Sequence, residues 1–139
     1  KVVMEGGKGL TLLANRMNDT IMKAMHDPAL ADHAQALARA LQRVGAATKA
    51  AWATGNPTEA LANATPYLQA FGHTVLAWIW LDVVLALPAA GDNRHAPFIE
   101  GKRAALRYFF HYELPKIDAW LGVVSSRDMT CATLSVEAF

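Results

Sequence analysis

The stretch "FGHTVLAWIWLDVVLAL", residues 71–87, is the most apolar run in the chain and decides the fold. Such a run belongs to a membrane span, to a cofactor pocket or to a buried helix. A helix that crosses a bilayer needs about 20 predominantly apolar residues. This run has His73 near one end, Asp82 in its second half and Pro88 directly after it, and a carboxylate deep in a bilayer costs roughly 2.5 to 3.5 kcal/mol even on lenient scales. The run therefore predicts a core helix and no membrane span.

The composition favours one apolar domain that has a protein partner. The 139 residues suit a single domain, residues 1–139, which can bury a core without a disulfide. Hydrophobic residues make up 53% of the chain and charged residues 18%, with a net charge of +1. A nucleic-acid-binding domain needs a strong basic excess, so this class is excluded.

Cysteine content and the N-terminal sequence bear on the compartment and on the extent of the chain. Cys131 is the single cysteine, so an internal disulfide is impossible and a cytoplasmic location is expected. We find no charged leader with an apolar core and a cleavage site. The chain begins with "KVVMEGG" and no initiating methionine, which favours a fragment of a longer protein.

Apolar residues at three- and four-residue steps predict two helices before residue 55. Asp27 is expected to cap the second of them, with Pro28 in its first position, and Gly55 is expected to end it. The first stripe is Leu10, Leu13, Met17, Ile21 and Met25, and the second is Leu30, Ala34, Leu37, Leu41, Val44, Thr48 and Ala51.

The second half of the chain carries further helix signals. In "NPTE", Asn56 is the expected cap and Glu59 reaches back to the first turn. Thr65 and Pro66 repeat the cap-and-proline pattern before the long apolar helix, and Pro115 should kink or divide the last one. The loop between these two helices is "AAGDNRHAP", residues 89–97. The last stripe is Ile99, Leu106, Phe110, Leu114, Ile117, Leu121 and Val124.

These patterns predict an all-α fold, a four-helix up-down bundle with a short extra helix and an irregular C-terminal tail. Only "KVV", residues 1–3, suggests extended backbone. The apolar helix is hydrophobic nearly all round, so it should lie at the centre of the bundle or at a subunit contact.

Two patterns suggest ligands but lack the required spacing. "EGGKG", residues 5–9, has neither the four-residue gap between glycines nor the Ser or Thr after lysine that a phosphate loop needs. We interpret it as a flexible start of the first helix. The histidines offer no pair four residues apart on one helix, so a metal site is not expected. They are His26, His33, His73, His95 and His111.

Asp82 is the most informative single residue, because it lies in the apolar helix and must reach a cation, a donor or solvent. We expect a structural ion pair with Arg103 or Arg107 in preference to an acid-base role. Arg103, Arg107 and His111 step by four and could meet an anion, although a solvated face is the commoner reading.

Four aromatic residues of the two apolar helices could form a stacking platform, but aromatics in such helices usually belong to the core. They are Trp78, Trp80, Phe109 and Phe110. Nothing in the chain combines a nucleophile with its base. The sequence predicts no catalytic, cofactor-binding or metal-binding residue.

Four segments together resemble a known family. They are "KVVMEGGKGL", "NATPYLQAFGHTVLAWIWL", "KRAALRYFFHYELPKIDAWL" and the terminal "VEAF". The pattern is similar to the C-terminal extension of flavin-dependent acyl-CoA dehydrogenases, in the subgroup of 3-methylmercaptopropionyl-CoA dehydrogenase. The likeness covers nearly the whole chain through helix patterns.

The resemblance implies a parent enzyme that oxidises an acyl-CoA at its α and β carbons. A glutamate base removes the α proton while FAD accepts a hydride from the β carbon. In this family the base lies in the dehydrogenase body, and Glu5 does not match it because "MEGGKG" differs from the family's tyrosine-glutamate-glycine segment. FAD is thus expected in the parent and none in this fragment.

The leading hypothesis is a non-catalytic helical domain that serves packing, oligomer contact or active-site cover. Its partners would be the dehydrogenase body of the same chain and further copies in a homo-oligomer, with acyl-CoA as the parent's substrate. The alternative is a stand-alone helical interaction module, and a third possibility is a small-ligand carrier with a pocket between helices.

Overall fold

The computed structural model describes residues 4–88 and 95–138, including all of their side chains except those of residues 4 and 5. The extended backbone expected for residues 1–3 and most of the loop expected at 89–97 lie outside these ranges. Every regular element in the described part is helical, which confirms the all-α prediction.

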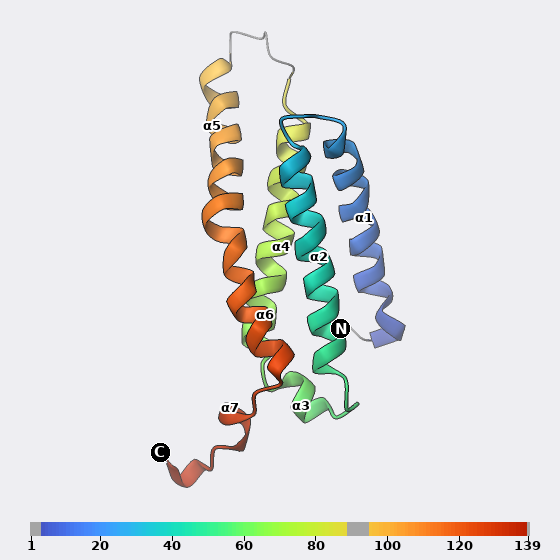
Figure 1. The fold of residues 1–139 in the computed structure, drawn as a ribbon, viewed down its shortest axis with the longest axis vertical. Coiled ribbons are helices and arrows are strands. Elements are labelled where there is room, and N and C mark those ends of the chain that lie inside the picture. Colours follow the sequence, from blue (N-terminus) through green and yellow to red (C-terminus); the bar gives the residue numbers. More distant parts are fainter. Residues whose placement is uncertain (1–3, 89–94, 139) are drawn as a thin grey trace.

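Four long helical segments run alternately up and down, as the sequence predicted (Figure 1). The first two are α1 and α2, the third is α4, and the fourth is formed by α5 and α6 together. A short helix, α3, joins α2 to α4 at the end of the bundle where the chain begins. The bounds are α1 Lys8–Met25, α2 Ala31–Ala51, α3 Pro57–Leu61, α4 Ala64–Leu85, α5 Ala96–Tyr108 and α6 Ile117–Ser126.

Helix α4 is the central element of the bundle. It packs against α1, α2, α5 and α6, while α2 packs against α1, α4 and α6. Small residues lie on the buried sides of α2 and α4, since Ala34 and Ala47 of α2 and Ala70 and Ala77 of α4 belong to the same core cluster. All four are at most 1% exposed, so both helices present small side chains to the core.

Glycine conformation sets the start of α1. Gly7 is its N-cap with a φ of 79°, a left-handed value that residues with a Cβ rarely adopt. This supports the reading of residues 5–9 as a helix start. The stripe on α1 is only partly as expected, because Met17 and Ile21 are buried, Leu10 and Leu13 are half-buried, and Met25 is 41% exposed.

The start of α2 differs from the prediction. The helix begins at Ala31 and not at Pro28. The Asp27 carboxylate accepts the backbone N–H of Ala29 at 2.9 Å, and the Asp27 carbonyl accepts those of Leu30 and Ala31. Asp27 therefore stabilises a separate turn that precedes the helix. The stripe along α2 is largely confirmed, with Leu41 and Thr48 only half-buried.

The "NPTE" signal is confirmed at α3. The Asn56 side chain accepts the backbone N–H of Thr58 at 2.9 Å, with Pro57 in the first turn. Glu59 reaches back to the side chains of Asn56 and Thr54. The second cap was predicted wrongly, because α4 begins at Ala64, one residue before Thr65.

The last long helix is divided at Pro115, as predicted. A π-helical turn at Phe109–Glu113 and a 3₁₀ turn at Leu114–Lys116 separate α5 from α6. Proline lacks the N–H that a continuous helix needs, and a π turn widens the local ring of hydrogen bonds. All seven residues of the expected apolar stripe are nonetheless buried.

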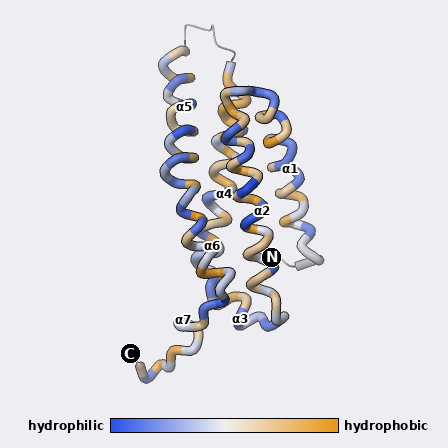
Figure 2. The backbone as a smooth tube through the Cα atoms, viewed as in Figure 1, coloured by the Kyte–Doolittle hydropathy of each residue, from blue (hydrophilic) through white to orange (hydrophobic). Residues whose placement is uncertain are grey.

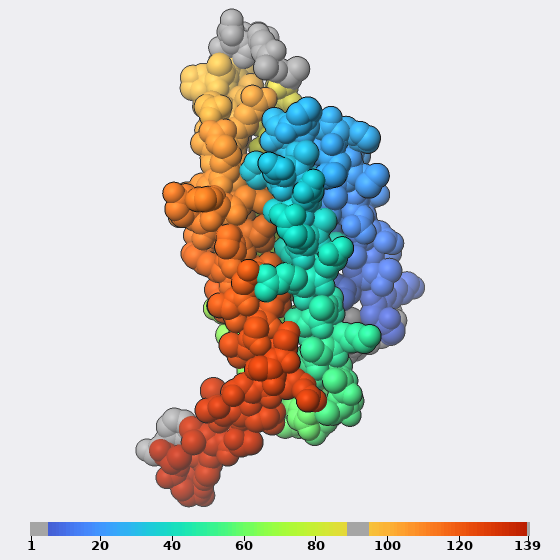
Figure 3. Space-filling model, viewed as in Figure 1, coloured from blue at the N-terminus to red at the C-terminus, as the bar shows by residue number. Residues whose placement is uncertain are grey.

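The C-terminal segment leaves the bundle. After α6 the chain forms one short helix, α7 (Thr130–Thr133), and then a 3₁₀ turn at Val136–Ala138. Both are exposed. Figure 3 shows this segment standing away from the rest of the molecule. The irregular tail is thus confirmed.

Helix α4 exposes an apolar outer side. Its buried residues recur at Ala70, Thr74, Ala77, Leu81 and Val84. At 100° per residue, the opposite side carries Leu68, Leu76 and Ile79, which are 69%, 45% and 44% exposed. Figure 2 shows apolar residues along α4, whereas hydrophilic residues recur along α5.

Among the described helices, α4 alone is both long enough and apolar enough to cross a membrane, judged by length and composition only. A core helix of a soluble protein meets the same criterion. The absence of a membrane span therefore stays a prediction.

The two sides of α4 should respond differently to truncation. Leu81→Ala removes a side chain with no exposed surface and should lower the free energy of unfolding by about 2 to 5 kcal/mol. Leu76→Ala, on the outer side of the same helix, should change it by about 0.5 kcal/mol or less. Denaturant titrations measure both values. Equal losses would contradict the assignment of the buried side.

Candidate functional site

Asp82 is not the buried ion that the sequence predicted. It is exposed, and it accepts a hydrogen bond from the Thr20 hydroxyl of α1 at 3.3 Å. Trp78 donates its indole N–H to the same hydroxyl at 2.8 Å. The expected ion pair with Arg103 or Arg107 is absent among the described residues, because Asp82 faces α1 while both arginines lie on α5.

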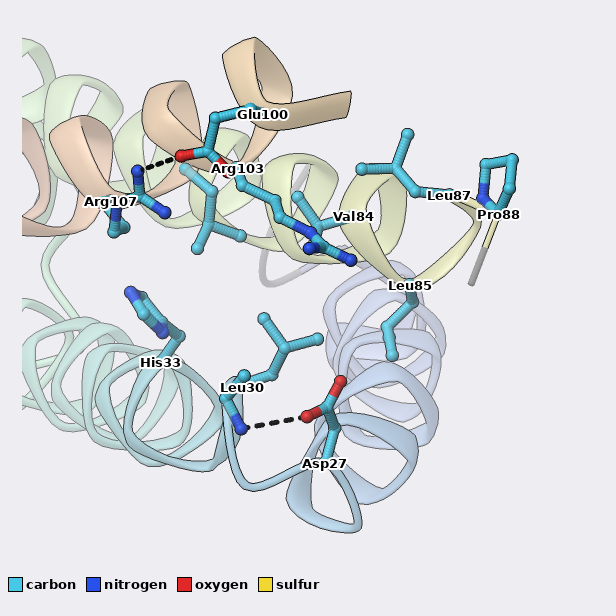
Figure 4. A pocket seen from close by; sticks show the side chains of 12 residues that line it. Asp27, Leu30, His33, Val84, Leu85, Leu87, Pro88, Glu100, Arg103 and Arg107 are labelled. Atoms are coloured by element: carbon cyan, nitrogen blue, oxygen red, sulfur yellow. Dashed lines mark hydrogen bonds and ion pairs between the residues drawn. The ribbon is translucent and has the colours of Figure 1, made fainter. Parts of the chain in front are cut away.

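A cleft of about 500 Å³ opens between the start of α2, the end of α4 and α5. Figure 4 shows His33 of α2 and Arg103 of α5 projecting into it from opposite walls. Most of the other lining side chains are apolar, and they lie just before α2, at and beyond the end of α4, and on α5. The lining includes Leu30, Val84, Leu85, Leu87, Pro88 and Leu106. This cleft is the candidate site.

Polar side chains lie around the mouth of the cleft. Arg107 donates to Glu100, two turns earlier on α5, at 2.6 Å, and both are more than half exposed. Arg107 lowers the pKa of the Glu100 carboxyl, by its hydrogen bond first and its charge second. Asp27 lies at the opposite edge, where its carboxylate caps the turn before α2.

His33 is the unusual polar group of the cleft. Its Nδ1 atom is buried and makes no hydrogen bond of full geometry, although the Ala29 carbonyl one turn earlier interacts with the ring and raises its pKa. The ring meets Phe110 edge-on at 5.0 Å between centroids. Burial is the main cause that lowers the pKa of His33. The Asp32 carboxylate opposes this shift, and the charge of Arg107 adds to it. The neutral imidazole is therefore the favoured form in the folded protein.

The three basic residues that step by four are not brought to one site. Arg103 and Arg107 line the cleft, whereas His111 lies in the π turn and borders a shallower hollow beside Asp32 and Phe110. The extra residue of the π turn changes the angular position of everything after it. Periodicity alone could not show this separation.

His73 takes part in a second polar cluster, at the level of the π turn. Its Nε2 atom is 3.6 Å from a Glu113 carboxylate oxygen, which also accepts from Lys116 at 2.7 Å. The hydrogen bond from Lys116 is the main cause that lowers the pKa of Glu113. The His73 ring packs edge-on against Trp120 at 4.8 Å. The cluster ties α4 to the junction of α5 and α6.

The aromatic residues belong mainly to the core, as predicted. Phe109 and Phe110 are buried, and Trp78 and Trp80 are half-buried against the same cluster. Among the residues that the structure describes, no three His, Cys, Asp or Glu side chains are grouped so that they could hold a metal. The side chain of Glu5 lies outside the description.

Sequence analysis missed the importance of His33. It assigned no role to this residue, although His33 lies between Leu30 and Leu37 in the sequence, at the edge of the apolar stripe of α2. A polar residue at that edge was the available signal. Its opposing wall on α5 is 70 residues away and could not be inferred.

A family model described as Acetyl-CoA dehydrogenase C-terminal like matches residues 13–135 of this chain. The chain belongs to this family. The matched range runs from the second turn of α1 through all the other long helices and α7. Neither the curated proteins nor the solved structures contain a significant match. The family membership makes the chain a helical domain of the kind found in acyl-CoA dehydrogenases.

Loss of the Asp82 carboxylate should have a small effect. Asp82→Ala should lower the free energy of unfolding by at most about 1 kcal/mol, because Thr20 can donate to the Arg16 carbonyl instead. Thr20→Val should cost more, about 1 to 3 kcal/mol, because it leaves the indole N–H of Trp78 without its acceptor. Denaturant titration of both variants compares them. A larger loss for Asp82→Ala would restore the buried-ion interpretation.

The buried imidazole should make stability depend on pH. The folded-state pKa of His33 is lowered from its ordinary value of 6.5, so below that pH the unfolded state binds more protons than the folded state. The free energy of unfolding should therefore fall as pH decreases from 7 through 6.5 toward the folded-state pKa. His33→Gln should flatten this slope, while His26→Gln, at an exposed position, should leave it unchanged. Equal slopes in all three proteins would show that His33 is not the cause.

Proposed function

We propose that this chain is a non-catalytic accessory domain of an FAD-dependent acyl-CoA dehydrogenase. The parent oxidises an acyl-CoA to the 2,3-enoyl-CoA and belongs to the subgroup of 3-methylmercaptopropionyl-CoA dehydrogenase. Family membership supports the general assignment, and the four segments quoted above support the subgroup. The catalytic glutamate and the FAD belong to the dehydrogenase body, which the cytoplasmic parent carries on the same chain.

The observation that carries this proposal is the exposed apolar side of α4. A monomeric soluble protein rarely exposes a long contiguous apolar strip. Leu68, Leu76 and Ile79 form such a strip on α4. Beside it, Trp80 and residues of α5 surround an open and almost wholly apolar hollow of about 560 Å³. We assign this side to the contact with the dehydrogenase body of the same chain.

Tyrosines of the last long helix extend the proposed contact. Tyr108 and Tyr112 are 55% and 59% exposed, and their rings stack with centroids 4.9 Å apart. Exposed aromatic side chains supply large contact area and are enriched at the energetic centres of interfaces. Homo-oligomer contacts of the parent and cover of its active site are further roles of the same accessory domain.

The polar residues of the domain support a structural role. Asp82 joins α1 to α4 through Thr20, and Glu113 joins α4 to the following segment through His73 and Lys116. The carboxylates of Asp82 and Glu113 thus both bond to residues that hold helices together. The rival assignment is a stand-alone interaction module. The coding sequence upstream of Lys1 separates the two assignments, since a dehydrogenase body encoded there would exclude the rival.

A charge on the outer side of α4 should weaken docking without unfolding the domain. In the full-length enzyme, Ile79→Asp should increase hydrogen exchange across α4 by at least tenfold, because it places a carboxylate in the proposed contact. Leu12→Asp, at a site on α1 that is 60% exposed, is the matched control and should leave exchange in α4 unchanged. Mass spectrometry of α4 peptides gives the measurement. Unchanged exchange in Ile79→Asp would reject this contact.

Turnover should not depend on Asp82. Asp82→Asn keeps an acceptor for the Thr20 hydroxyl and removes the charge, so kcat of the full-length enzyme should stay within about twofold. Steady-state assays with FAD-loaded enzyme give the value. A hundredfold fall in kcat with an unchanged melting temperature would show that the domain takes part in catalysis.

A further inference from the structure

The cleft between α2, α4 and α5 is a consequence of the divided last helix. The second half of that helix, α6, packs closely on α2, whereas α5 contacts α4 and stands apart from α2 (Figure 1). The π turn at Phe109–Glu113 lies between the two halves. Such turns are frequent at functional sites because they reposition the side chains around them. Here the separation leaves the volume of about 500 Å³ open.

The cleft combines an apolar floor with a cationic wall. Leu30, Val84 and Leu106 are buried at its base. Arg103 of α5 is half-buried and extends over this floor (Figure 4). Among the side chains that the structure describes, no carboxylate lies within ion-pair distance of Arg103. A half-buried guanidinium above apolar side chains is a favourable site for an anionic group that carries an aliphatic chain.

His33 supplies a second polar group on the opposite wall. Its buried Nδ1 atom makes no hydrogen bond of full geometry, and the Ala29 carbonyl one turn earlier gives it only a weak one, although buried ring nitrogens in native proteins are normally well bonded to protein, water or ligand. Figure 4 shows the ring directed into the cleft, toward α5. The charged groups around it are Asp32 on its own helix and Arg107 on α5. An anion held by Arg103 would lie between the two walls.

We infer that this cleft binds a small aliphatic monocarboxylate, with its chain on Leu30, Val84 and Leu106 and its carboxylate between Arg103 and His33. A volume of about 500 Å³ lies within the usual range for small-molecule sites, about 300 to 1,000 Å³. This binding site is separate from the apolar side of α4 that the proposed function uses.

The charges at the mouth favour a single negative charge on the ligand. Glu100 forms an ion pair with Arg107, and the Asp27 carboxylate lies at the opposite edge of the cleft. Both carboxylates would repel a dianion more strongly than a monoanion. A monocarboxylate therefore fits the cleft better than a phosphate, and a free carboxylic acid and inorganic phosphate can be compared directly.

Calorimetric titration of the purified full-length protein with octanoate tests the inference. We expect saturable binding to one site, at least tenfold weaker in Arg103→Ala because the cation is lost. Ala29→Trp places a large ring at an exposed position that lines the cleft and should abolish binding. Arg39→Ala, at an exposed arginine of α2 outside the cleft, is the matched control and should bind like the unmodified protein. Inorganic phosphate should bind at least tenfold more weakly than octanoate.

The role of His33 has its own readout. A carboxylate beside the ring should raise its pKa, so binding near pH 6.5 should take up a proton and the measured enthalpy should depend on the ionisation enthalpy of the buffer. His33→Gln should remove this dependence. Three results would each overturn the inference: no saturable octanoate binding, binding that survives both Arg103→Ala and Ala29→Trp, or phosphate binding as tight as that of octanoate. Buffer dependence that persists in His33→Gln would overturn the placement of the carboxylate.

Discussion

One constraint governs this domain: the central helix is apolar on two sides, and a four-helix bundle can bury only one of them. The inner side of α4 packs against all the other long helices through small and medium side chains. The outer side carries Leu68, Leu76 and Ile79 to the surface. Burial of the inner side fixes the order of helices around α4, and exposure of the outer side gives the domain a surface for association.

Alanine is frequent on the buried sides of α2 and α4. Ala34, Ala47, Ala70 and Ala77 belong to one core cluster, and none of these is more than 1% exposed. The polar links between helices lie at the margins of this cluster. The Thr48 hydroxyl bonds the Tyr67 hydroxyl at 2.8 Å, and other margins carry the Trp78–Thr20–Asp82 chain and the ion pair of Arg43 with Asp118. These links fix the register of helices whose apolar contacts are unspecific.

The π turn has the opposite effect on the last helix. It allows the stripe from Ile99 to Val124 to stay buried on both sides of Pro115, and it also separates α5 from α2. The same local change in backbone thus maintains the core near α6 and opens the cleft near α5. His111 lies outside the cleft, in a second hollow that it shares with Arg107, so the cationic wall of the cleft has two residues from this helix and not three.

The sequence by itself determined the helices and their buried faces. Residues at three- and four-residue steps identified the stripes of α2 and of α5 with α6, and Asn56 and Pro115 identified a cap and a break, because these signals act within a few residues of the chain. Their partners across the bundle were decided only by the tertiary structure. The sequence predicted an ion pair of Asp82 with an arginine, because a carboxylate buried in an apolar helix would require a cation. The angular position of Asp82 on α4 instead turns it toward α1 and solvent. His33 became part of a cleft only because residues of α5, distant in sequence, form its opposite wall. Which side of a helix faces which neighbour depends on packing between elements, and local spacing carries no information about it.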